Sequence, residues 1–195
     1  MAKTKNSRKN LNKTVAIVGI GRVGLPLALF LANHGYKVYG LDVDEKKINL
    51  ILGGQMPFKE EGAAALLKKH VNKSFIPSSD FSLVAKSKVI ILTLGTPVDE
   101  NMNPSLVQID AAMDSIKPYL TKDQLLILRS TVSPGTTNYV KSYIEDIGKF
   151  AVGENFYLAF CPERIAEGKS LKELAEIPQI VGGVDRISTQ RAADF

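Results

Sequence analysis

The stretch TVAIVGIGRVG, residues 14–24, decides the fold of this chain. Its first part, residues 14–20, is a β-branched apolar run, which predicts a strand buried on both faces. The glycines then follow the pattern G-x-G-x-x-G, and residues 22–33 have the composition of a helix. A glycine-rich turn between a buried strand and a helix N-terminus is the arrangement that binds the diphosphate of a dinucleotide.

Each glycine of this turn has a separate physical role. Gly19 permits the tight turn, Gly21 lets the backbone approach a diphosphate, and Gly24 allows the helix to pack closely on the strand. The N–H groups and the partial positive charge of the helix N-terminus then face the phosphates. The predicted cofactor-binding residues of the turn are Gly19, Ile20, Gly21, Arg22, Val23 and Gly24.

An acidic residue completes the dinucleotide pattern about 20 positions further on. Residues 37–42 predict a second strand, and Asp42 stands at its end. A carboxylate there accepts hydrogen bonds from the adenosine ribose hydroxyls and repels a 2′-phosphate, which favours NAD over NADP. The alternative is that Asp42 only caps the helix predicted over residues 44–52.

Strands and helices continue to alternate along the chain. Further helices are expected at 62–70, within 104–119 and at 136–147, and further strands at 88–94, 124–128, 156–160 and 179–184. This alternation predicts an α/β fold, a Rossmann-like doubly wound and mostly parallel sheet with helices on both faces. We expect residues 14–195 to form this one domain, with the start of another helix at its end.

Composition excludes several other classes of protein. The net charge of +5 equals the five basic residues of a tail over residues 1–13, which has no acidic residue and is expected to be disordered. The body is therefore nearly neutral, which argues against nucleic-acid binding. No apolar run approaches the roughly 20 residues of a membrane span, and the N-terminus lacks a secretory pattern. One cysteine and two histidines argue against a metal site and suit the cytoplasm.

Three later motifs, each directly after a predicted strand, resemble a known family. They are LGTPV at 94–98, STVSPGTT at 130–137 and CPERIAEG at 161–168. In order and spacing they are similar to the N-terminal domain of the UDP-glucose/GDP-mannose dehydrogenase family, over about residues 14–184. The resemblance implies an enzyme that oxidises the 6-hydroxyl of a nucleotide-linked sugar to a carboxylate while reducing two NAD.

The resemblance also implies cofactor contacts beyond the glycine turn. Lys47 matches a lysine that joins the acidic residue at the adenosine ribose, although a solvent-facing helix lysine is nearly as plausible. Thr96 and Pro97 would form a rigid turn against the cofactor, or an ordinary exit from a strand. Thr131 matches a threonine near the nicotinamide, and Glu167 matches a glutamate at the nicotinamide end.

Two residues carry the catalytic roles that the resemblance implies. Thr131 orients a catalytic water, and Glu163 assists that water during thioester hydrolysis. Glu163, Arg164, Ile165 and Ala166 would contact the sugar nucleotide; the alternative is a solvated, charged loop. For the hydroxyls that follow Pro134, a role in the site and a plain helix N-cap are equally open.

Part of the family's machinery is absent from this sequence. The family's nucleophilic cysteine lies in a later segment, so Cys161 is expected to be a small buried residue. Family members are about twice as long and commonly dimerise through a central helix. Because that nucleophilic cysteine is absent here, we expect this chain to bind NAD without turning over a nucleotide sugar. Arg164, where UDP-glucose and GDP-mannose enzymes usually have Phe, favours a UDP-N-acetylhexosamine, especially UDP-N-acetylmannosamine.

Two other functions fit parts of the sequence. A stand-alone Rossmann domain could sense NAD or NADH and contact a partner through the basic tail. A dehydrogenase of the β-hydroxyacid or 6-phosphogluconate type would share the glycine turn and the general fold. That second class lacks the combined motifs at 130–137 and 161–168, which ranks it lower.

Overall fold

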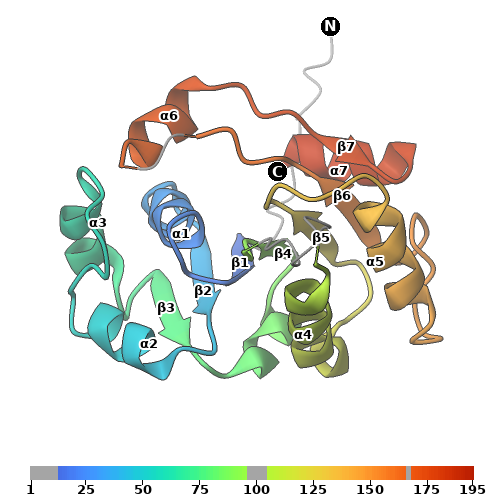
Figure 1. The fold of residues 1–195 in the computed structure, drawn as a ribbon, viewed down its shortest axis with the longest axis horizontal. Coiled ribbons are helices and arrows are strands. Elements are labelled where there is room, and N and C mark those ends of the chain that lie inside the picture. The colour runs from blue at the N-terminus through green and yellow to red at the C-terminus, as the bar shows by residue number, and fades with distance from the viewer. Residues whose placement is uncertain (1–12, 96–104, 166–167) are drawn as a thin grey trace, which may run out of the picture.

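The computed structural model describes residues 13–95, 105–165 and 168–195, and in this part of the chain a single sheet forms the centre (Figure 1). Its strand order is β3-β2-β1-β4-β5-β6-β7. All neighbouring strands pair in parallel except β6 and β7, which are antiparallel. The predicted α/β fold with a mostly parallel sheet is therefore confirmed.

The elements have the following bounds. The strands are β1 Thr14–Val18, β2 Lys37–Leu41, β3 Phe75–Ser78, β4 Val89–Leu92, β5 Leu125–Leu128, β6 Tyr157–Phe160 and β7 Gly182–Gly183. The helices are α1 Gly24–Asn33, α2 Glu45–Leu52, α3 Ala63–His70, α4 Val107–Ile116, α5 Thr136–Glu145, α6 Ser170–Glu176 and α7 Arg186–Asp194, with 3₁₀ turns η1 Phe81–Lys86 and η2 Lys117–Tyr119.

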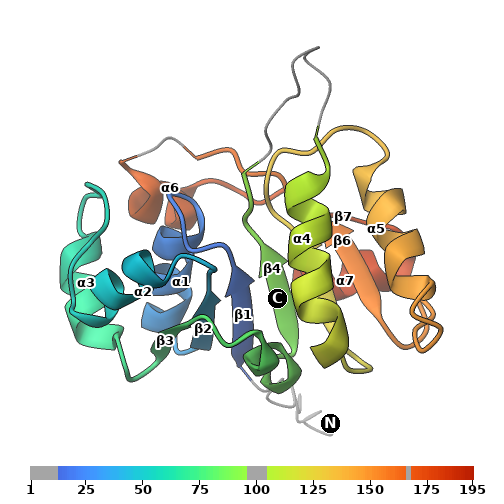
Figure 2. The ribbon, with the colours of Figure 1, turned by 60° about the horizontal axis from the view of Figure 1, so that its bottom comes forward.

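Helices cover both faces of the sheet because successive strand residues point to opposite sides. In β1, Val15 and Ile17 belong to one buried cluster, shared with α1, α2 and α3. Ala16 and Val18 belong to a second cluster, shared with α4 and α5. Figures 1 and 2 show α1 and α4 on opposite sides of the strands. A strand buried on both faces needs apolar residues throughout, as the sequence of β1 predicts.

The order of strands reverses beside β1. The chain runs from β1 outward through β2 to β3, then returns to add β4 on the other side of β1. Helices on the two sides of this point diverge, which opens a crevice at the carboxyl ends of β1 and β4. Ligands of doubly wound sheets bind at such a crevice.

Some element predictions were wrong. Strand β3 and helix α6 were not predicted, and the strand expected at 179–184 is reduced to the two residues of β7. The first strand ends at Val18, two residues early, because Gly19 turns the chain with a φ of 91°. The helix expected at the end of the chain is confirmed as α7. The tail at residues 1–12 lies outside the described residues.

A buried glutamate fixes the segment that follows β6. Glu60, before α3, accepts hydrogen bonds from the backbone N–H of Gly168 (3.0 Å) and of Ser170 (2.7 Å). The Ser170 hydroxyl also donates to this carboxylate. A carboxylate at the first turn of α6 complements the positive end of that helix. These hydrogen bonds therefore join the end of the loop between β6 and α6 to the segment that precedes α3.

A buried histidine predicts that the stability of the fold depends on pH. His70 Nδ1 lies 2.7 Å from the Ser74 hydroxyl and Nε2 lies 3.1 Å from Asn33 Oδ1; because Asn33 Oδ1 can only accept, the neutral ring that fits donates from Nε2 and accepts at Nδ1. Burial, and then the charges of Lys69 and Lys73, lower the pKa of His70 below its usual value of 6.5. The fold thus favours the neutral form of this ring, with both nitrogens hydrogen-bonded.

We expect the free energy of unfolding to decrease as the pH falls through about 6.5. Below that value the unfolded chain binds a proton at His70 that the folded chain does not, so folding loses free energy until the lower folded pKa is reached. Urea unfolding between pH 5 and pH 7.5 measures the effect. In a His70→Gln variant this slope should flatten, and an unchanged slope in the variant would contradict the assignment.

Candidate functional site

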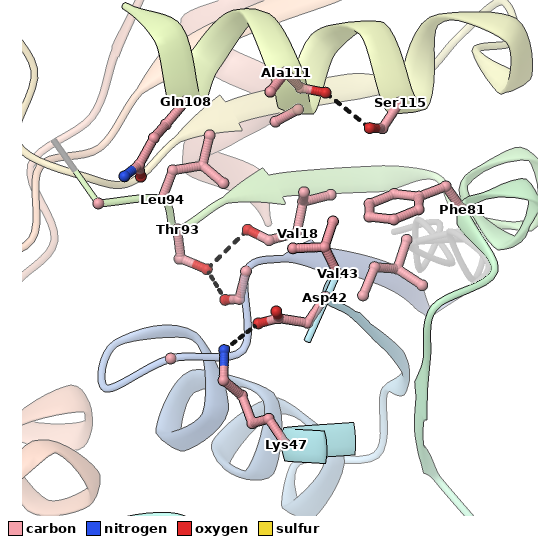
Figure 3. Close-up of a pocket in the computed structure, with 15 residues that line it drawn as sticks. Val18, Asp42, Val43, Lys47, Phe81, Thr93, Leu94, Gln108, Ala111 and Ser115 are labelled. Atoms are coloured by element: carbon pink, nitrogen blue, oxygen red, sulfur yellow. Dashed lines mark hydrogen bonds and ion pairs between the residues drawn. The ribbon is translucent and has the colours of Figure 1, made fainter. Parts of the chain in front are cut away.

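A cleft of about 470 Å³ opens at the carboxyl ends of β1, β2 and β4 and is closed on one side by α4 (Figure 3). It lies at the point where the strand order reverses. Its lining residues are Val18, Gly19, Gly21, Leu41, Asp42, Val43, Lys47, Phe81, Thr93, Leu94, Gly95, Gln108, Ala111, Ala112 and Ser115.

The three glycines of the turn meet two kinds of environment. A Cβ on Gly24 would lie 2.0 Å from the carbonyl oxygen of Gly19, and one on Gly19 would lie 2.6 Å from the carbonyl oxygen of Thr93. These two positions allow no side chain, since backbone blocks them. A Cβ on Gly21 would meet nothing within 4 Å. The backbone at Gly21 is therefore open to the cleft, which is the space that a diphosphate requires.

The N-terminus of α1 faces this turn without a side-chain cap. Val23 is the N-cap residue and makes no side-chain hydrogen bond to the helix. Arg22 is exposed and places its guanidinium over the ring of Phe58, 5.6 Å from the centroid. Ile20 is fully buried, and its N–H donates to Asp42. Of the predicted turn residues, Ile20 thus supports the turn from behind.

Asp42 and Lys47 meet at the edge of the cleft. Asp42 Oδ2 accepts hydrogen bonds from Ile20 N (3.0 Å) and from Lys47 Nζ (2.8 Å), and Oδ1 accepts from Asp44 N (3.0 Å). The N-cap of α2 is Asp44, which accepts from Lys47 N. The alternative that Asp42 only caps this helix is therefore wrong. The lysine predicted beside the acid forms an ion pair with it.

Several other residues that line the cleft were not predicted from the sequence. Val43, which follows Asp42 and is 79% exposed, and Phe81 contribute apolar side chains. Ala111 and Ser115 of α4, one helical turn apart, contribute small side chains (Figure 3). Apolar and small side chains of this kind suit contact with a flat ring. The only signal in the sequence was the spacing of the small residues on α4.

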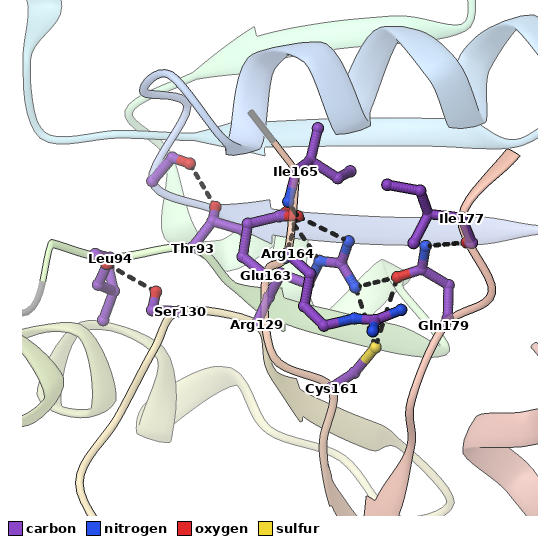
Figure 4. A network of polar contacts seen from close by, with 11 residues as sticks. Thr93, Leu94, Arg129, Ser130, Cys161, Glu163, Arg164, Ile165, Ile177 and Gln179 are labelled. Atoms are coloured by element: carbon purple, nitrogen blue, oxygen red, sulfur yellow. Dashed lines mark hydrogen bonds and ion pairs between the residues drawn. The ribbon is translucent and has the colours of Figure 1, made fainter. Parts of the chain in front are cut away.

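A second polar cluster lies at the carboxyl ends of β5 and β6, around Arg129 (Figure 4). Arg129 forms a two-pronged ion pair with Glu163, Nε to Oε2 at 3.0 Å and Nη2 to Oε1 at 3.2 Å. The side chains are 5% and 13% exposed. The remaining nitrogen of Arg129, Nη1, donates to Cys161 Sγ (2.9 Å) and to Gln179 Oε1 (2.5 Å).

The loop after β6 folds back on Glu163. Glu163 Oε1 also accepts the backbone N–H groups of Arg164 (2.8 Å) and Ile165 (3.0 Å). The guanidinium of Arg164 is exposed and donates to Pro178 O. The loop predicted to meet a sugar nucleotide thus directs these two amides toward its own glutamate. Ala166 and Glu167, two further predicted site residues, lie outside the described residues.

The segment after β5 presents hydroxyl groups at the same edge of the sheet. Thr131, a predicted catalytic residue, is exposed there. Ser130 Oγ donates to Leu94 O (2.6 Å), which joins the segments that leave β5 and β4. Gly135 is the N-cap of α5, so the interpretation of the following hydroxyls as N-caps is wrong. The predicted cofactor residues Thr96 and Pro97 lie outside the described residues.

Other expectations concern the single cysteine and the metal-binding side chains. Cys161 is buried, as predicted. Among the described residues, no group of three or more His, Cys, Asp or Glu side chains is placed to hold a metal ion. Within the same ranges, every helix is too short or too polar to span a lipid bilayer.

A glycine turn at the reversal of strand order, an uncapped helix N-terminus and an acid at the end of the second strand together define a dinucleotide-binding Rossmann domain. The sequence pattern of the UDP-glucose/GDP-mannose dehydrogenase family, NAD binding domain, matches residues 13–194. The chain belongs to this family, as its NAD-binding domain.

Relatives with named activities cover nearly the whole chain. A UDP-N-acetyl-D-mannosamine dehydrogenase from Methanococcus aeolicus is 36% identical over 98% of this chain. The structure of the UDP-N-acetylmannosamine enzyme from Pyrococcus horikoshii superimposes with a TM-score of 0.89 at 28% identity over 93% of the chain. A GDP-mannose dehydrogenase from Pseudomonas aeruginosa gives 0.86 at 30% over 92%. The chain spans 43% of the length of each of these three proteins.

Proposed function

We propose that this chain is the NAD-binding part of a nucleotide-sugar 6-dehydrogenase that acts on a UDP-N-acetylhexosamine, with UDP-N-acetylmannosamine as the preferred substrate. Membership of the family supports the reaction class. Relatives named for UDP-N-acetylmannosamine support the sugar, as does the arginine at position 164. The observation that carries the proposal is the position of Glu163 and Thr131 at the carboxyl ends of neighbouring strands, on the edge where the glycine turn binds the cofactor.

NAD would lie with its diphosphate against Gly21 and the N-terminus of α1. The open space at Gly21 and the uncapped helix end support this placement. Asp42 and Lys47 would hold the adenosine ribose from the cleft edge, where the carboxylate disfavours a 2′-phosphate. When bound, NAD supplies the hydride acceptor for both oxidation steps. Thr96, Pro97 and Glu167 remain further proposed contacts.

Glu163 is proposed to assist a water molecule that Thr131 orients. The two carboxylate oxygens of Glu163 differ in what they can do. Oε1 already accepts three hydrogen bonds, from the backbone of Arg164 and Ile165 and from Arg129 Nη2. In the described part of the chain, Oε2 accepts only from Arg129 Nε. Oε2 therefore has room for a hydrogen bond from water, and we assign the proton-accepting role to this atom.

The chain by itself is expected to bind NAD without producing NADH. The family's covalent route needs a cysteine thiolate, and the one cysteine here, Cys161, is buried under Arg129. Calorimetry with NAD and absorbance at the NADH band, with and without UDP-sugars, test both parts. NADH formation by the 195-residue chain would show that it holds a complete active site, against this proposal.

The substrate is tested on the product of the complete natural reading frame. A panel of UDP-N-acetylmannosamine, UDP-N-acetylglucosamine, UDP-glucose and GDP-mannose is expected to give the highest kcat/KM with the first. Activity with UDP-glucose alone would reject the sugar assignment while leaving the reaction class in place. We further propose a cytoplasmic enzyme that assembles as a homodimer, which light scattering on the same preparation would measure.

A further inference from the structure

Thr93 is a buried polar residue at the end of β4 that neither the sequence motifs nor the proposed mechanism uses. It is 8% exposed and lines the cofactor cleft. Its hydroxyl donates to the carbonyl oxygen of Gly19 at 2.6 Å and lies 3.2 Å from that of Val18. The backbone N–H of Thr93 also donates to Val18 O, at 2.9 Å. Thr93 thus holds the end of β1 and the first residue of the glycine turn (Figure 3).

The peptide group between Gly19 and Ile20 is also held on its other side, by a residue at the end of a different strand. The carbonyl of Gly19 and the N–H of Ile20 belong to one rigid peptide plane and point in opposite directions. The hydroxyl of Thr93, at the end of β4, donates to the carbonyl. The carboxylate of Asp42, at the end of β2, accepts from the N–H at 3.0 Å. Two side chains from two strands therefore fix the rotation of the peptide that enters the turn.

This peptide determines what the turn presents to an anion. A carbonyl oxygen rotated toward the cleft would place partial negative charge against a diphosphate. Because Gly19 O accepts the hydrogen bond from Thr93 Oγ1, a protein donor offsets its partial negative charge and holds the peptide against rotation. Thr93 also lies close to the first residue of α1, because a Cβ on Gly24 would lie only 2.5 Å from Thr93 Oγ1. Donors that are already oriented cost less free energy to bring to a ligand.

We propose that Thr93 is a positioning residue for NAD, whose hydroxyl orients the Gly19–Ile20 peptide so that the turn and the N-terminus of α1 face the cofactor's diphosphate. The proposal rests on NAD binding by this domain, which the family establishes. It assigns Thr93 no direct contact with the cofactor.

The test compares two variants of the 195-residue chain. Thr93→Val keeps the shape and removes the hydroxyl, whereas Thr93→Ser keeps the hydroxyl and removes the methyl group. Calorimetry with NAD and ADP, and NMR titration with adenosine, give three affinities for each protein. For Thr93→Val we expect NAD and ADP to bind about tenfold more weakly, roughly the effect of one hydrogen bond, and adenosine to bind within about twofold of wild type. Thr93→Ser should bind all three within about threefold.

A second readout does not depend on any ligand. Hydrogen exchange at the Ile20 amide should speed up in Thr93→Val, while the amide of Ile17 inside β1 stays protected. If Thr93→Val does not fold, Thr93→Ala carries the same comparison.

NAD affinity within twofold of wild type in the valine variant would overturn the proposal. So would an equal loss for adenosine and ADP together with a lower unfolding midpoint, because that pattern is the mark of a purely structural residue. Failure of the wild-type chain to bind NAD would instead count against the cofactor assignment itself.

Discussion

Replacing Arg129 by methionine is expected to lower the free energy of unfolding by about 3–5 kcal/mol, the usual cost of removing one partner of a buried ion pair. Glu163 is 13% exposed and would lose both prongs of its pair. Cys161 and Gln179 would each lose a donor as well. Equilibrium urea unfolding, followed by circular dichroism, measures the loss.

The charge on Glu163 causes most of this loss, and a double variant separates it from the packing of Arg129. Gln in place of Glu163 keeps the acceptor for the amides of Arg164 and Ile165 but carries no charge. The variant Arg129→Met/Glu163→Gln should therefore be more stable than Arg129→Met alone, by about 2 kcal/mol. If the two changes simply add, the ion pair is not what stabilises the ends of β5 and β6.

Local patterns in the sequence were sufficient to predict most of the sheet but not β3, the strand at one of its edges. Strand β3 has the sequence Phe75-Ile76-Pro77-Ser78, and a proline inside a short run argues against a central strand. Among the strands of the described residues, β3 has β2 as its one neighbour in the sheet, so it is an edge strand and tolerates the missing N–H. Helix α6 was missed for a different reason. Its seven residues are held by Glu60, 110 positions before Ser170, a contact that no local pattern reveals.

The candidate site likewise contains residues that local patterns predict and residues that they do not. The glycine turn and Asp42 could be predicted because their roles depend on spacing along the chain. Thr93 and Arg129 could not, because their partners lie 74 and 34 positions away. Arg129 did leave a signal, since a charged residue that directly extends a buried apolar strand must find a partner when the strand is buried. Which residue it pairs with emerges only when β5 and β6 are aligned side by side.

The glycine turn allows the sharpest separation of folding from cofactor binding. Gly24→Ala should destabilise the chain by more than about 2 kcal/mol, because its Cβ would meet backbone at 2.0 Å. Gly21→Ala should leave stability within about 1 kcal/mol of wild type, since its Cβ meets nothing within 4 Å. The same methyl group would occupy the space that the diphosphate needs, so NAD affinity should fall at least tenfold.

Gly182→Ala is the matched control for this pair. Gly182 also has nothing within 4 Å of an added Cβ, but it lies in β7, at the opposite edge of the sheet from β3 and away from the cleft. We expect this variant to keep both its stability and its NAD affinity. Urea unfolding and calorimetry on the three variants give the comparison. If Gly21→Ala binds NAD as tightly as Gly182→Ala does, the diphosphate does not approach the turn at Gly21. The cofactor would then have to bind by a route other than the open backbone between β1 and α1.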